Sequence, residues 1–125
     1  EAGTWTGKGS FTCSKGIQEM AISPDGQRLA VFCGKKIEII NTESLERTGI
    51  LEGHEAAGYG IGFSPDGRYL VSGSGDQTVK FWNLNRMNCT LTIHGYEDQI
   101  YNCRFVDGNT LFLSSPQGKI WYYRF

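Results

Sequence analysis

The sequence repeats itself at intervals of about 40 residues, and this interval limits the possible folds more than any other feature of the chain. The stretch ISPDGQRLAVF begins at Ile22, and the similar stretch FSPDGRYLVSG begins at Phe63. A degraded third copy, FVDGNTLFL, begins at Phe105, which continues the same spacing. A fixed period of this length indicates an array of structural units that bury their apolar side chains against one another.

Each unit contains short apolar runs separated by tight turns. In Ser-Pro-Asp-Gly the proline sets φ for a type I turn, the serine and aspartate bond to nearby backbone, and the glycine closes the turn. The β-branched and aromatic runs on either side predict strands. No segment carries the i, i+3, i+4, i+7 apolar spacing of a helix. The sequence therefore predicts an all-β fold of four-stranded antiparallel units, the third of which reaches Phe125 without its fourth strand.

Composition excludes several classes of partner. The 125 residues carry a net charge of −1, so there is no electrostatic basis for binding nucleic acid or an anionic membrane. Apolar residues make up 39% of the chain but occur in short runs, and we expect neither a membrane span nor a signal peptide. We therefore expect no membrane contact, and contact with RNA only indirectly.

The second unit carries the most specific motif. Gly53-His54 precedes its first strand, FSPDG follows that strand, SGSGD ends at Asp76, and Phe81-Trp82-Asn83 ends the third strand. This pattern resembles WD40 repeats, with Asn83 where the family usually has aspartate. The resemblance implies WD40-type β-propeller blades at about 11–52, 53–94 and 95–125, which together form one partial propeller of three blades over residues 1–125.

The resemblance also implies a structural tetrad in the second blade. Its members would be His54, Ser72 (or Ser74), Asp76 and Trp82, joined in a buried hydrogen-bond chain. A buried imidazole, carboxylate and indole N–H must all find partners, and these groups can satisfy one another. Histidine, serine and aspartate are also the residue types of a hydrolase triad, but no GxSxG elbow is present. We therefore predict a non-catalytic chain with no catalytic residues and no cofactor.

The other two units depart from the motif. The first has Gly34-Lys35-Lys36 in place of the aspartate and Ile40 in place of the tryptophan. The third has Gly95-Tyr96 in place of Gly-His, Gln117 in place of the aspartate and Tyr123 in place of the tryptophan. We expect both blades to be held by apolar packing.

The four cysteines show no metal-binding or disulfide pattern. Cys13, Cys33, Cys89 and Cys103 form no CxxC pair, and two histidines are too few to complete a zinc site with them. We expect all four to be reduced packing residues of an intracellular protein, with a disulfide framework as the alternative. No metal is expected.

Three blades are fewer than the four to eight that close a propeller, which would leave two apolar faces uncovered. We expect the chain to be a fragment whose remaining blades lie elsewhere. The alternatives are a second copy, which would give six blades, or an open array held by a partner. The N-terminal stretch EAGTWTGKGSFT is expected to be a remnant from a preceding blade, or else a strand that completes the third unit.

The resemblance implies a scaffold for protein–protein contacts in a multiprotein complex. The candidate partner contacts are Lys35, Tyr59, Tyr96 and Gln117. The segment GHEAAGYGIGFSPDG (53–67) is similar to the WD-repeat second-step pre-mRNA splicing factors, which implies mRNA splicing and favours the nucleus over the cytoplasm. The alternatives are a substrate-receptor or assembly propeller in ubiquitin ligation, chromatin or trafficking, and a propeller domain that accompanies a hydrolase.

Overall fold

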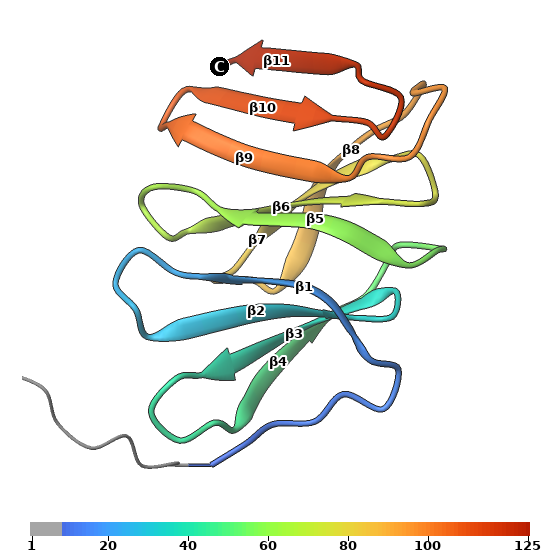
Figure 1. Cartoon of the computed structure of the whole chain (residues 1–125). Helices are drawn as coiled ribbons and strands as arrows, with labels where there is room; N and C mark the ends of the chain where they lie inside the picture. The colour runs from blue at the N-terminus through green and yellow to red at the C-terminus, as the bar shows by residue number, and fades with distance from the viewer. Residues whose placement is uncertain (1–8) are drawn as a thin grey trace, which may run out of the picture.

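Three antiparallel sheets are stacked one on the next in the computed structural model, which describes residues 9–125 (Figure 1). The first sheet contains β1 (Ile17–Ile22), β2 (Arg28–Cys33), β3 (Lys36–Asn41) and β4 (Arg47–Leu51). The second contains β5 (Gly58–Phe63), β6 (Tyr69–Ser74), β7 (Val79–Asn83) and β8 (Asn88–Ile93). The third contains β9 (Asn102–Asp107), β10 (Thr110–Ser114) and β11 (Ile120–Arg124).

In every sheet each strand pairs with its neighbour in the chain, so each sheet is a meander. The described part of the chain contains no helix, and consequently none that could cross a membrane. The all-β prediction is confirmed, and the sheets do not close into a ring, so the chain is a partial propeller. Residues 1–8, which include most of the predicted N-terminal remnant, lie outside the described residues.

The first strands of the three sheets lie side by side, with β5 between β1 and β9. Gly60 in β5 makes this approach possible. A Cβ atom at Gly60 would lie 2.9 Å from both Asn102 Cα and the backbone nitrogen of Cys103. Because those atoms belong to the backbone of β9, a larger residue at Gly60 would push the second and third sheets apart.

The repeated turn owes its shape to the residues that recur in it. In the first copy Ser23 Oγ donates to Asp25 Oδ1 at 2.7 Å and accepts from the Arg28 N–H at 2.9 Å, while Gly26 has a φ of +75°. In the second copy Ser64 and Asp66 make the same side-chain bond at 2.6 Å. Each turn therefore joins the first two strands of its blade through local polar contacts.

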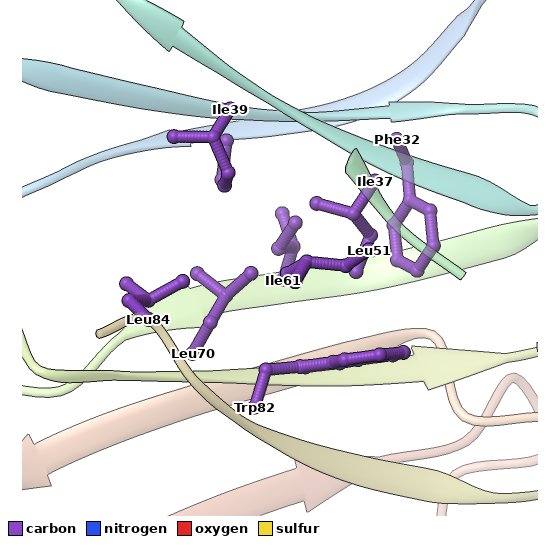
Figure 2. Packing of buried hydrophobic residues seen from close by; sticks show 9 residues of the cluster. Phe32, Ile37, Ile39, Leu51, Ile61, Leu70, Trp82 and Leu84 are labelled. Atoms are coloured by element: carbon purple, nitrogen blue, oxygen red, sulfur yellow. The ribbon is translucent and has the colours of Figure 1, made fainter. Parts of the chain in front are cut away.

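Two apolar cores lie between the sheets. In the first, side chains from the first sheet meet side chains from the second, with Trp82 facing Phe32 and Leu51 (Figure 2). The remaining buried members of this core are Ala30, Ile37, Ile39, Ile61, Leu70 and Leu84. The second core joins the second and third sheets through Val71, Val79, Phe81, Ile100, Cys103, Leu111 and Leu113. Each sheet is thus stabilised mainly by burying a face against its neighbour.

Only one of the two end faces of the described stack is open, which corrects the prediction that both would be. On the first sheet Val31, Cys33 and Ile40 are buried, with Phe11 and Cys13 of the N-terminal segment packed against them. On the third sheet the far face is exposed, and Phe112 and Tyr122 stack there with ring centroids 5.7 Å apart. Residues 9–16 therefore cover the face that a preceding blade would occupy.

Cys13 and Cys33 form a disulfide, so the prediction of four reduced cysteines is wrong for this pair. Their Cα atoms are 5.7 Å apart although the residues are 20 positions apart in the chain. The contact arises because the N-terminal segment runs back across the outer face of the first sheet. Cys89 and Cys103 are free, as predicted, but only Cys103 is buried, so the prediction of a packing role is wrong for Cys89.

Candidate functional site

Four side chains of the second blade form one continuous hydrogen-bonded chain. Trp82 Nε1 lies 2.8 Å from Ser72 Oγ, and His54 Nε2 lies 2.7 Å from the same oxygen. On the other side of the imidazole, His54 Nδ1 lies 2.9 Å from Asp76 Oδ2. These residues come from the segment before β5, from β6, from the β6–β7 turn and from β7. Ser74 has a separate task, because its hydroxyl bonds to the carbonyls of Ala56 and Ala57.

The direction of each hydrogen bond follows from the indole, which can only donate. Ser72 Oγ accepts from Trp82, so its own hydrogen goes to His54 Nε2. The imidazole proton is then assigned to Nδ1, which donates to Asp76 Oδ2. Asp76 also accepts from the Glu55 N–H at 2.9 Å and from the Thr78 hydroxyl at 2.6 Å. Every buried polar atom of the tetrad has a partner, and the tetrad ties the loop before β5 to the turn between β6 and β7.

The surroundings of the two titratable members of the tetrad, His54 and Asp76, leave one neutral and the other charged at pH 7. Burial lowers the pKa of His54, and the hydrogen bond and charge of Asp76 oppose this effect only in part, so the imidazole is neutral at pH 7. Burial raises the pKa of Asp76, but hydrogen bonds from Thr78, from the Glu55 N–H and from His54 outweigh it and bring the pKa to about 2. The site therefore pairs a neutral imidazole with a carboxylate.

This geometry does not suit nucleophilic catalysis. The exposed fraction of Ser72 is 0%, and both hydrogen-bonding roles of its hydroxyl are already occupied inside the blade. No substrate can reach its oxygen without unfolding the blade. The arrangement is one that stabilises the blade and fixes its loops.

The third blade replaces the tetrad with a pair of tyrosines. Tyr123 pairs across the sheet with Leu111 as Trp82 pairs with Leu70, so the two aromatic residues are equivalent in register. The hydroxyl groups of Tyr96 and Tyr123 are 2.6 Å apart, and burial together with this bond raises the pKa of Tyr96. Apolar packing holds this blade, as predicted, and the bond between the two tyrosine hydroxyl groups adds a polar contact. In the first blade Ile40 takes the place of the tryptophan. It is buried in a cluster with Val31, and Phe11 packs against this cluster, as the prediction of apolar packing requires.

The four candidate contact residues have different environments. Lys35 and Gln117 are exposed in the β2–β3 and β10–β11 turns. Tyr59 is half-buried, and its ring lies 4.6 Å from that of Tyr101. Tyr96 packs against the second core and Trp121, so its ring is largely committed to the interior.

Tyr101 is a residue that the sequence reasoning missed, although it lies one repeat period after Tyr59. Its exposed fraction is 38%. The β2–β3, β6–β7 and β10–β11 turns lie on one edge of the stack, on the right of Figure 1, where β5 and β9 also begin. We call this edge, which carries Lys35, Tyr59, Tyr101 and Gln117, the tyrosine edge.

The stacked meanders, their aligned first strands and the His–Ser–Trp chain define the class of protein, which is a β-propeller blade protein. Residues 45–83 match the family model "WD domain, G-beta repeat", and this match spans β4 to β7.

The chain is also similar to several WD-repeat relatives. An "Uncharacterized WD repeat-containing protein sll1491" of Synechocystis sp. is 36% identical over 102 residues, which covers 81% of this chain and 29% of that protein. An "Intraflagellar transport protein 122 homolog" of Xenopus tropicalis is 31% identical over 105 residues, 84% of this chain and 9% of that protein. A "Target of rapamycin complex subunit LST8-1" of Arabidopsis thaliana is 31% identical over 75 residues, 58% of this chain and 25% of that protein.

These matches support the assignment of the chain to the WD40 repeat family. The chain spans less than a third of the length of each of these three relatives.

Proposed function

We propose that the chain is part of a non-catalytic WD-repeat scaffold that holds other proteins of a complex through the tyrosine edge. The observation that carries this proposal is the contrast between the two kinds of side chain in the second blade. The polar groups of the tetrad bond to one another inside the blade, whereas the rings of Tyr59 and Tyr101 contact each other at an edge made of turns. Rigid turns that present a preformed aromatic pair are suited to anchoring a partner protein.

The relatives support a role in assemblies. One is named as a transport protein and another as a subunit of a complex. Neither name mentions a catalytic activity. The chain corresponds to only part of each relative, so the partners of the whole protein are proposed and not taken from these names.

Within this class we propose a nuclear role in pre-mRNA splicing as the first assignment to test. Its support is the segment 53–67, with Gly53-His54 followed by Ala57-Gly58-Tyr59. The net charge of −1 favours contact with RNA through partner proteins. Trafficking is the second candidate, favoured by the transport relative. The remaining alternatives are ubiquitin ligation, chromatin assembly and a propeller domain that accompanies a hydrolase.

Co-purification with a matched pair of variants tests the proposal. Tyr101→Ala removes an aromatic ring from the tyrosine edge, and Tyr69→Ala removes one of nearly equal exposure, 39% against 38%, from the opposite end of the second sheet. We expect the tagged protein to lose its partner proteins with Tyr101→Ala and to keep them with Tyr69→Ala, while both variants melt as folded proteins.

Equal retention by the two variants would contradict the use of this edge. Spliceosomal proteins and small nuclear RNA among the partners would support the splicing assignment. Transport, ligase or chromatin subunits in their place would select one of the alternatives.

A further inference from the structure

The Cys13–Cys33 disulfide lies beside a surface hollow of about 360 Å³. Cys33 lines this hollow together with Lys15, Lys35, Lys36 and Glu38. Cys13 is half-buried, and all three lysines are exposed. Cys33 itself is only 5% exposed, so a thiol reaches its sulfur through this hollow, whose walls carry cationic side chains.

The charge of the hollow is positive after its ion pairs are considered. Lys36 Nζ pairs with Glu52 at 3.3 Å, and Glu38 pairs with Arg47 Nη1 at 3.5 Å. Among residues 9–125 no salt bridge involves Lys15 or Lys35. Two ammonium groups that form no salt bridge thus line a hollow that has room for a small molecule.

A metal ion fits this hollow poorly. The sulfur atoms of Cys13 and Cys33 and a carboxylate oxygen of Glu38 lie within 4.8 Å of one another, which is a spacing that metal ligands also show. However, the carboxylate is already paired with Arg47, and the neighbouring lysines would repel a cation. The same lysines would attract an anion.

We propose that the Cys13–Cys33 pair is a thiol-exchange site for a small anionic thiol of the glutathione type, whose carboxylates are held by Lys15 and Lys35. The incoming thiolate forms a bond to Sγ of Cys33. The bond between Cys33 and Cys13 breaks, and Cys13 leaves as a thiolate that takes a proton from water. A second small thiol then attacks the mixed disulfide, releases Cys33 as a thiol and leaves as the oxidised small disulfide, so two thiols supply both electrons.

Thiol exchange at this site determines how firmly residues 9–16 are held on the outer face of the first sheet. The disulfide holds the segment 9–16 on the outer face, where Phe11 packs against the cluster that contains Val31 and Ile40. When the bond opens, the segment keeps the apolar packing of Phe11 and its contacts with neighbouring turns, such as that of Lys15 with Gly34, but loses its covalent link to the sheet. Reduction therefore frees the face to which a neighbouring blade or protein can bind.

The other two cysteines are separable from this site. Cys89 is exposed in β8, where its free thiol would be alkylated in the readout and would exchange with the mixed disulfide, so the test uses the Cys89→Ala background. Cys103 is buried, and burial raises the pKa of its thiol, which keeps it unreactive.

The experiment compares two thiols on the oxidised Cys89→Ala protein: reduced glutathione, which is anionic, and 2-mercaptoethanol, which carries no carboxylate. Rates of disulfide opening are read by alkylation and intact mass, in this protein and in a Lys15→Gln/Lys35→Gln variant. We expect the ratio of the glutathione rate to the 2-mercaptoethanol rate to fall about fivefold in the double variant at low ionic strength, and the difference to shrink in salt. We also expect residues 9–16 to exchange amide hydrogen faster after reduction, and equally fast in Cys13→Ser.

Three results would overturn the proposal. One is alkylation of both cysteines in protein purified without reductant, which would show that the bond does not form. Another is an unchanged ratio of rates in the lysine variant. The third is a stoichiometric metal ion that is lost in Cys13→Ser, which would make the pair a metal site.

Discussion

Removal of the Ser72 hydroxyl is the sharpest test of the polar chain in the second blade. In Ser72→Ala, Trp82 Nε1–H loses its acceptor and His54 Nε2 loses its donor. The exposed fractions of these two residues are only 1% and 4%, so water cannot replace the lost partner. An unsatisfied buried polar group costs about 1–3 kcal/mol, so for the two groups we expect a loss of about 2–6 kcal/mol in the free energy of unfolding.

Urea unfolding of the full chain measures this loss, and a double-mutant cycle identifies its origin. Trp82→Phe removes the indole N–H, so the Ser72→Ala/Trp82→Phe variant leaves only the imidazole unpaired. We expect it to cost less than the sum of the single variants, by about 1 kcal/mol or more. Ser44→Ala, at an exposed turn position, is the matched control and should stay within about 0.5 kcal/mol of the parent chain.

Two outcomes would refute this reasoning. The first is a Ser72→Ala chain as stable as the Ser44→Ala control. The second is strict additivity in the cycle, which would show that the serine and the indole do not stabilise each other.

Three further predictions concern the blades and their contacts. Acid should destabilise the chain in two windows, because the pKa of His54 lies below 6.5 and that of Asp76 is about 2 against 3.8. Because the unfolded chain takes up these protons more readily than the folded chain, stability is complete at neutral pH and falls as the pH falls. The His54 part is lost below 6.5 and the Asp76 part from about 4 to 2. In pH-dependent unfolding, Asp76→Asn should remove about 2 kcal/mol of the loss between pH 4 and 2. Gly60→Ala should lower the free energy of unfolding in urea by about 1–3 kcal/mol, because it forces β5 and β9 apart. Gly108→Ala should leave the free energy of unfolding unchanged, because a Cβ there meets nothing within 4 Å. Tyr123→Phe should lower stability by about 1 kcal/mol in thermal melts, and an unchanged melting temperature would show that its hydroxyl bond contributes nothing.

The sequence by itself determined the features that depend on local chemistry and on the repeat. Ser-Pro-Asp-Gly specifies its own turn through short-range contacts, as Ser23, Asp25 and Arg28 show. The repeat period then predicts the succession of strands, because equivalent residues recur at equivalent places in each sheet. All four members of the tetrad lie in one repeat, so their proximity follows from the pairing of strands that are neighbours in the chain.

Only the tertiary structure decided how the ends of the stack and the degenerate blades are completed. Cys13 reaches Cys33 because the N-terminal segment crosses the outer face of the first sheet, a path that no local motif specifies. Tyr96 bonds to Tyr123 because β11 and the segment before β9 meet across the second core. These contacts join segments from different strands or from outside the strands, and the apolar burial that brings such segments together has no preferred direction. No local motif therefore specifies which residues of the two segments meet.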